Sequence, residues 1–168
     1  MATHKVIQVS TTGAQSEYAG KATSAGAGDS GEFPILDGTG KLDVTFMPNG
    51  VGADSITLVA GEALAAGDFV YVLAGGGVMK ADATTYAKRA MGYVLTSVLN
   101  GGNATVFFDD SNSALSGLTP GGMYYLSATA GLATLTAPTT STQYVQELGI
   151  ATSATSLHVN IKTPILRA

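Results

Sequence analysis

The chain has 168 residues and no cysteine, so it is long enough for one hydrophobic core and excludes disulfides, thiolate zinc sites and a cysteine nucleophile. Its 8 basic residues are scattered and outnumbered by 12 acidic ones, with a formal net charge of -4, so we expect no nucleic-acid partner. Only 12% of the residues are charged, against about 25% in ordinary soluble domains, and depletion of charge favours a protein that binds neighbouring subunits.

The sequence predicts neither export nor membrane insertion. Residues 1–8 lack a basic segment followed by a long apolar run, and no apolar stretch reaches the roughly 18 residues that a membrane span requires. We therefore expect a soluble protein without a membrane partner.

Residues 1–54 differ in composition from the rest of the chain. The stretch 10–31 consists mainly of Ala, Gly, Ser and Thr, and its only large apolar side chain is Tyr18, so it cannot bury enough surface to order itself. Between 32 and 48, short apolar groups are separated by Pro, Gly and Asp, without the periodicity of a helix or a long strand. We predict an extended N-terminal arm over 1–54 that lies along a partner; the alternative is a flexible tail.

The apolar side chains of this arm are its candidate anchors, because apolar and aromatic residues supply most interface energy. The predicted anchors are Phe33, Ile35, Leu36, Leu42, Val44, Phe46 and Met47. Main-chain pairing could also add a strand to the sheet edge of a neighbour, through Val6, Ile7 and Val9.

From residue 55 onward, short segments rich in β-branched and aromatic residues alternate with turn residues. This pattern predicts an all-β domain over 55–168, a barrel or a sandwich. The expected strands are 56–59, 69–73, 78–80, 91–98, 104–108, 123–126, 132–135, 146–151 and 157–161. The only candidate helix, 81–89, contains two adjacent threonines, so we predict a loop or a single turn there.

An internal repeat supports the β prediction. Residues 64–72 align with 118–126 at an offset of 54 residues, and each copy reads as a turn followed by a hairpin. An apolar-Gly-apolar step follows in each copy, at 91–93 and at 148–150, and each copy ends in an alternating strand. Two such units can cover each other's free edges. We therefore expect one domain with approximate internal two-fold symmetry.

No motif in the sequence indicates catalysis, and we expect no enzyme activity, no cofactor and no metal site. Residues 26–31 match G-x-G-x-x-G, but Pro34 follows where a helix would have to begin. The two histidines, His4 and His158, lack the companion motifs of a nucleophile and an orienting carboxylate. Residues 109–112 offer oxygen ligands without the Gly and Glu of a calcium loop, so we expect a turn.

The segment 35–48, ILDGTGKLDVTFMP, followed by GVGAD at 50–54, is similar to a sequence common in structural proteins of tailed bacteriophages. Followed in order by 63–70, 80–84 and 117–127, it resembles phage capsid decoration, or cement, proteins over residues 33–168. The element L-D-x-x-G-K-L-D-x-x-F-M-P also occurs near the attachment ends of tail fibres.

The resemblance implies a non-enzymatic virion protein on the outer surface of the capsid. Such proteins assemble as small oligomers, often homotrimers, and stabilise the phage head by bridging major capsid proteins. Two alternatives remain: a phage tail or head fibre protein involved in host attachment, and a small hydrolase or lyase on a β-barrel.

Overall fold

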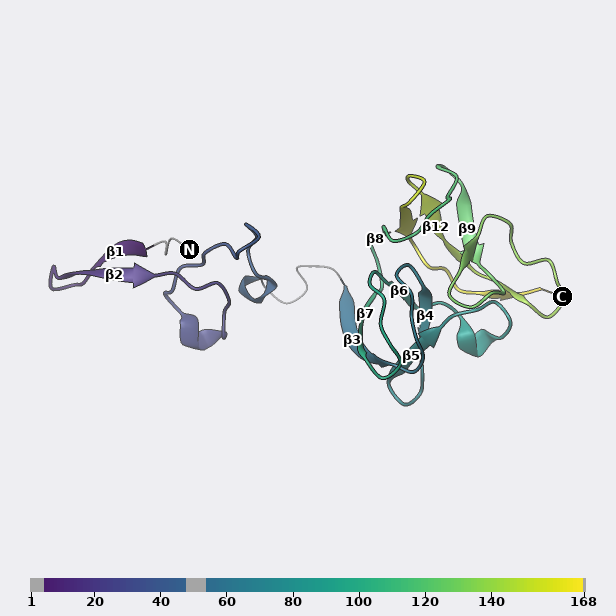
Figure 1. The fold of residues 1–168 in the computed structure, drawn as a ribbon, viewed down its shortest axis with the longest axis horizontal. Helices are drawn as coiled ribbons and strands as arrows, with labels where there is room; N and C mark the ends of the chain where they lie inside the picture. Colours follow the sequence, from purple (N-terminus) through teal and green to yellow (C-terminus); the bar gives the residue numbers. More distant parts are fainter. Residues whose placement is uncertain (1–4, 48–53, 168) are drawn as a thin grey trace. The chain divides into compact units, whose positions relative to one another are not determined.

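The computed structural model describes residues 5–47 and 54–167. The chain divides into two compact units, Met1–Gly52 and Ala53–Ala168, which we call the N-terminal and the C-terminal unit. The all-β prediction is confirmed, because strands make up most of the regular structure, and the described residues add only three short 3-10 turns (Figure 1).

The N-terminal unit is built on a β-hairpin that the sequence analysis missed. β1 (Lys5–Val9) pairs antiparallel with β2 (Gln15–Ala19). The connecting turn is closed by Gly13, whose φ of 80° suits glycine, and its N–H donates to the Ser10 carbonyl oxygen at 2.9 Å. Two 3-10 turns follow, η1 (Ala27–Asp29) and η2 (Val44–Phe46). Backbone pairing orders part of the 10–31 stretch, which has too few apolar residues to order itself by burial.

A closed five-stranded barrel forms the first half of the C-terminal unit. Its strands, in barrel order, are β3 (Ser55–Ala60), β5 (Gly77–Lys80), β4 (Phe69–Val72), β6 (Gly92–Val94) and β7 (Asn103–Phe107). β3 closes the barrel, since it pairs antiparallel with β7 and parallel with β5. Small and β-branched side chains fill the interior, among them Val70, Val78, Val94, Ala104 and Val106.

The second half repeats this strand order in an open sheet. Its strands, in sheet order, are β10 (Ala133–Thr134), β9 (Met123–Leu126), β12 (Glu147–Ala151), β13 (Leu157–Val159) and β8 (Ser111–Asn112). β8 lies beside β13 as β3 lies beside β7, but it has two residues and does not reach β10. A separate two-stranded sheet joins β11 (Tyr144–Val145) to β14 (Ile165–Leu166).

The repeated apolar-Gly-apolar step has the same packing role in both halves. A Cβ at Gly92 would lie 2.5 Å from the carbonyl oxygen of Phe107 on the next strand. At the equivalent Gly149, a Cβ would overlap the carbonyl oxygen of His158. Glycine at this step therefore lets the last strand of each copy approach its neighbour closely.

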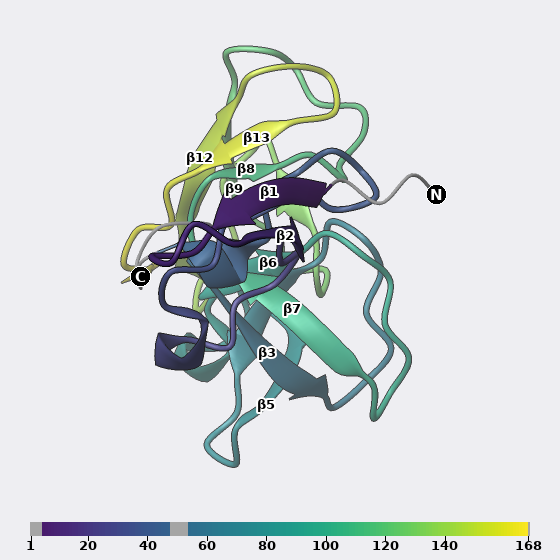
Figure 2. The ribbon, with the colours of Figure 1, turned by 90° about the vertical axis from the view of Figure 1, so that its left-hand side faces the viewer.

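The two halves share a hydrophobic core that is separate from the cluster inside the barrel. β4 points Val70 into the barrel and Phe69 into the shared core, where Phe69 meets residues of the second half such as Leu126 and Leu148. Figure 2 shows β12 and β13 at one end of the C-terminal unit and β3 and β5 at the other. The prediction of a loop or a single turn over 81–89 is confirmed, because this segment is a loop with one 3-10 turn, η3 (Tyr86–Lys88).

A buried amide links the halves at their boundary. The side chain of Gln146, 1% exposed, accepts the Ala90 N–H at 2.8 Å and donates to the Ala90 carbonyl oxygen at 2.9 Å. Its second amide hydrogen donates to the carbonyl oxygen of Lys162 at 3.0 Å. These bonds satisfy the polar groups of Gln146 within the core and hold two segments that are far apart in sequence.

Candidate functional site

The candidate site is the surface of the N-terminal unit that carries the predicted anchors. Two of these residues, Phe33 and Ile35, are half-buried and have a role inside the unit. Their backbones flank Lys21, whose N–H donates to the Phe33 carbonyl oxygen at 3.0 Å and whose carbonyl oxygen accepts the Ile35 N–H at 2.9 Å. Their side chains lie over Gly20, where a Cβ would come within 2.5 Å of the Phe33 ring.

The hairpin completes this small cluster. The ring centroids of Tyr18 on β2 and Phe33 lie 5.4 Å apart at an interplanar angle of 57°, a tilted geometry that aromatic pairs favour. The Lys21 ammonium also binds the Asp29 carboxylate at 2.6 Å. Phe33 and Ile35 therefore fix the segment after η1 against the hairpin, a role that the sequence analysis did not predict.

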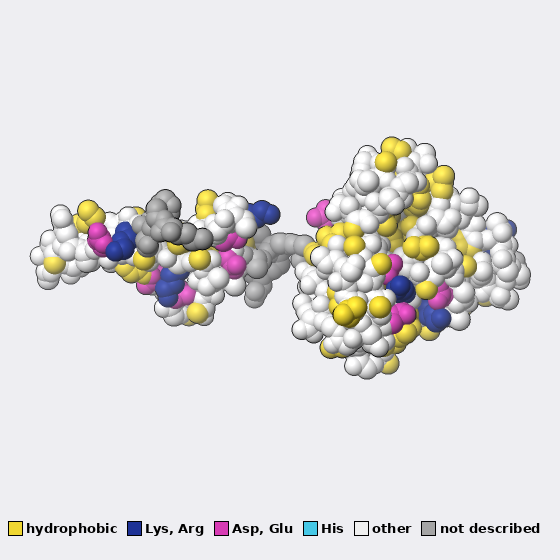
Figure 3. Space-filling view, in the orientation of Figure 1, with side chains coloured by type: hydrophobic (Ala, Val, Ile, Leu, Met, Phe, Trp, Pro, Cys, Tyr) yellow, Lys and Arg dark blue, Asp and Glu magenta, His cyan; other side chains and the backbone are white. Residues whose placement is uncertain are grey.

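Other predicted anchors remain available at the surface. Leu36 is 60% exposed, and Leu42 and Met47 are also exposed, whereas Phe46 is half-buried in η2. Val44 begins η2, and its side chain lies outside the described part of the structure. Figure 3 shows apolar side chains at several places on the visible face of the N-terminal unit, interspersed with Lys, Asp and Glu side chains.

Two Asp-x-Thr turns hold the loops that present these side chains. The Asp37 carboxylate accepts the Thr39 N–H at 2.8 Å and the Lys41 N–H at 3.0 Å. The Asp43 carboxylate accepts the Thr45 hydroxyl at 2.7 Å and the Thr45 N–H at 2.9 Å. The Lys41 and Thr39 donors lower the pKa of Asp37, and the Thr45 donors lower that of Asp43. The segment is therefore a series of fixed turns, which its Asp, Gly and Thr spacing could have indicated.

The hairpin adds an exposed strand edge to this surface. Within the described residues, β1 pairs with β2 alone, in a two-stranded sheet. Its apolar side chains are exposed: Val6, Ile7 at 69%, and Val9. A free edge with apolar side chains can pair with a strand of another protein.

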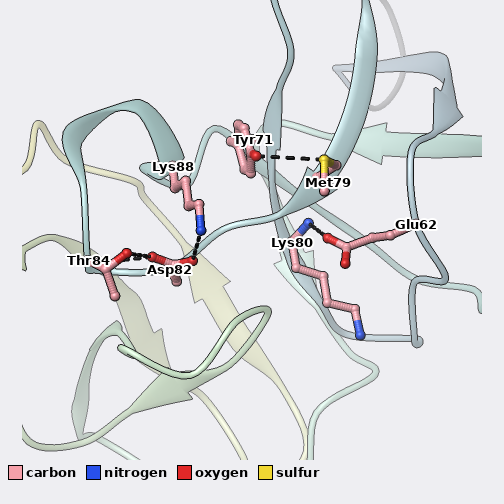
Figure 4. Close-up of polar contacts among 7 residues, drawn as sticks. All are labelled: Glu62, Tyr71, Met79, Lys80, Asp82, Thr84 and Lys88. Atoms are coloured by element: carbon pink, nitrogen blue, oxygen red, sulfur yellow. Dashed lines mark hydrogen bonds and ion pairs between the residues drawn. The ribbon is translucent and has the colours of Figure 1, made fainter.

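The C-terminal unit contains a charged cluster with a structural role (Figure 4). The Asp82 carboxylate accepts the Thr84 N–H at 2.9 Å and the Lys88 ammonium at 3.1 Å. Burial raises the pKa of Asp82, but the bonds from Thr84 and Lys88 outweigh burial and lower it overall. Glu62 accepts the backbone N–H of Lys80 at 2.8 Å, and the Lys80 ammonium lies 3.3 Å from the Asp68 carboxylate. These contacts hold β5 and the loop after it.

The remaining features concern histidine, acidic clusters and membrane-spanning helices in the described residues. His158 is exposed on β13. No group of three or more His, Asp or Glu residues in the described ranges could hold a metal ion. Within the same ranges, no helix is long and apolar enough to cross a membrane. Neither the protein-family models nor the curated proteins gave a match to the chain.

Proposed function

We propose that this chain is a structural virion protein of a tailed bacteriophage, a decoration or cement protein that binds the outer surface of the capsid. The C-terminal unit is the folded body, and the N-terminal unit binds major capsid proteins across the boundary between neighbouring subunits. Contacts that span two capsid subunits oppose their separation when packaged DNA pressurises the head. Many identical sites on one shell multiply weak contacts by avidity.

The observation that carries the proposal is the exposure of apolar side chains on a unit without a core of its own. No residue with a described side chain in 5–47 is buried, and Leu36, Leu42 and Met47 lie exposed between fixed turns. The same segment carries the phage resemblance at 35–48. Exposed apolar side chains that fill no core of their own are the groups that supply most interface energy, which favours a docking role for this segment.

Binding to expanded heads tests the proposal. Heads of a phage that encodes this sequence, prepared without the protein, are mixed with the full chain and sedimented. Wild-type protein is expected to sediment with the heads, and Leu36→Ser combined with Met47→Ser is expected to weaken binding at least ten-fold. Leu99→Ser, at an exposed position in the C-terminal unit, is the matched control and should bind normally. Labelled protein found at the tail instead would favour the fibre alternative and contradict the proposal.

A further inference from the structure

The C-terminal unit contains an open cleft of about 190 Å³ between η3 and the segment before β14. Its walls include Tyr86, Arg89, Gln146, Ile161, Lys162 and Thr163. The Arg89 guanidinium lies 4.6 Å from the centroid of the Tyr86 ring and donates to the Tyr86 carbonyl oxygen at 3.3 Å. Stacking on Tyr86 fixes the plane of the guanidinium and leaves other N–H donors for a ligand.

The positive charge of this cleft is not neutralised within the described part of the chain. The neighbouring Lys80 and Lys88 pair with Asp68 and Asp82 at 3.3 and 3.1 Å. Arg89 and Lys162 have no carboxylate within 4.0 Å among the described residues, and none lines the cleft. Two cations at one cleft in a chain of net charge -4 indicate a ligand with a carboxylate, which Arg binds in a bidentate manner.

The walls favour a carboxylate carried by a peptide over an acidic sugar. Gln146 already uses both amide hydrogens and its carbonyl oxygen on Ala90 and Lys162, so it has no free donor for sugar hydroxyls. The Tyr86 ring and Ile161 are apolar, and β14 beside the cleft exposes Ile165 at 72% and Leu166. An acidic side chain with apolar neighbours matches this surface.

The C-terminal unit itself presents exposed carboxylates, on the turn between β7 and β8. Asp109 and Asp110 are both exposed, and neither lies within 4.0 Å of a cationic side chain among the described residues. The turn is fixed by the Tyr93 hydroxyl, which donates to the Asp109 carbonyl oxygen at 2.8 Å, and by the Val159 N–H, which donates to the Asp110 carbonyl oxygen at 2.8 Å. Asp110 has a φ of 79°, a conformation that non-glycine residues adopt rarely and that aspartate tolerates best with asparagine.

We propose that the cleft of one copy binds the Asp109–Asp110 turn of a second copy of this chain. The contact is heterologous, because different surfaces meet, so repeating it builds a ring if the rotation closes. Opposite charges set the orientation, and the exposed Ile165 and Leu166, which directly follow the cleft residue Pro164, add apolar contact. This inference rests on the proposed function and deepens it, because it names the contact through which copies of the chain join.

Complementation between two variants in solution tests the contact without capsids. The cleft variant carries Arg89→Glu and Lys162→Glu, and the turn variant carries Asp109→Asn and Asp110→Asn, which keep hydrogen-bond acceptors and tolerate a positive φ. Sedimentation velocity of wild type at low salt should show association, with at least ten-fold weaker self-association for each variant alone. Their mixture should form a 1:1 heterodimer through the one remaining intact interface.

Controls separate this contact from general charge effects. Lys5→Glu with Lys41→Glu makes the same change of net charge in the N-terminal unit, outside the proposed contact, and should associate as wild type does. Arg89→Gln with Lys162→Gln, a milder cleft variant, should also weaken association, with circular dichroism confirming the fold of every variant. Monomeric wild type at low salt, a mixture that stays monomeric, or equal weakening by the control pair would each overturn the proposal. If the contact between copies fails this test, wild-type protein should still bind phage heads. If the proposed function fails instead, wild-type protein should not bind heads but should still self-associate.

Discussion

The two units of the chain are held together by different interactions. In the C-terminal unit, large side chains such as Tyr93, Phe69 and Leu126 are almost completely buried. In the N-terminal unit, no residue with a described side chain in 5–47 is buried, and its order comes from one hairpin, turns capped by aspartate and the cluster around Gly20. A two-stranded hairpin alone is marginally stable in water. The comparison indicates that the C-terminal unit is held by burial, whereas local hydrogen bonds hold the N-terminal unit. Under the proposed function, binding to the capsid makes the N-terminal unit rigid.

The largest expected difference comes from removing one aromatic side chain from each unit. Phe69→Ala opens the shared core and should lower the free energy of unfolding of the C-terminal unit by about 3–5 kcal/mol. Phe33→Ala should leave that transition unchanged and increase amide exchange in β1 and β2. Urea unfolding and hydrogen exchange measure the two effects. Equal losses in urea unfolding would show that the two units share one core.

Gly149 tests the close approach of strands within the C-terminal unit. Gly149→Ala should cost about 1–3 kcal/mol, because its Cβ has no room beside the His158 carbonyl. Gly75→Ala is the control, since a Cβ there meets nothing within 4 Å, and its effect should stay within about 0.5 kcal/mol. Thermal unfolding of both variants compares the positions, and an unaffected Gly149→Ala would refute the packing role of the repeated step.

Gln146 tests whether buried polar bonds hold the two halves together. Gln146→Met keeps the volume but leaves the Ala90 N–H and carbonyl oxygen without partners, which should cost about 2 kcal/mol. Gln143→Met, at a half-buried position nearby, should change the unfolding free energy by less than about 0.5 kcal/mol. Similar denaturant midpoints for these two variants would contradict the role assigned to Gln146.

Replacing Asp82 should have the smallest effect on stability, and this effect should depend on pH. Its pKa in the folded protein lies below the ordinary 3.8, so its charged form stabilises the fold above that pH, and the contribution is lost as the pH falls through the lowered value. Asp82→Asn should therefore be less stable than wild type at pH 7, with a gap that shrinks at pH 3. Urea midpoints at both pH values measure this difference in stability. A difference that widens at pH 3 would mean that the pKa of Asp82 is raised in the folded protein rather than lowered.

The hydrophobic pattern and the internal repeat predicted the all-β fold of the C-terminal unit, because in that unit the apolar side chains that form the pattern are buried. The step at Gly92 and Gly149 was visible in the sequence, although its cause, the carbonyl of the adjoining strand, was not. The strand expected over 91–98 covers only Gly92–Val94, since the chain turns after Val94 and Val98 returns to form a single bridge with Leu64.

Several features could not be predicted from apolar pattern because backbone bonds and tertiary contacts create them. β8 and β11 have two residues each, too short for a periodic signal. The parallel pairing of β3 with β5 depends on barrel closure. In the N-terminal unit, the hairpin and the turns at Asp37 and Asp43 arise from local hydrogen bonds. Whether the predicted anchors contact a capsid stays a prediction, and the structure adds internal roles for Phe33 and Ile35.

Hydrogen–deuterium exchange of the full chain, free and bound to expanded phage heads, tests the central claim most directly. In the free protein, amides of β1, β2 and residues 33–47 should exchange within minutes, while those of β4 and β9 are protected for hours. On heads, exchange in the N-terminal unit should slow at least ten-fold, with β4 and β9 unchanged. Strong protection of β1 and 33–47 in the free chain, or no change on heads, would contradict the account.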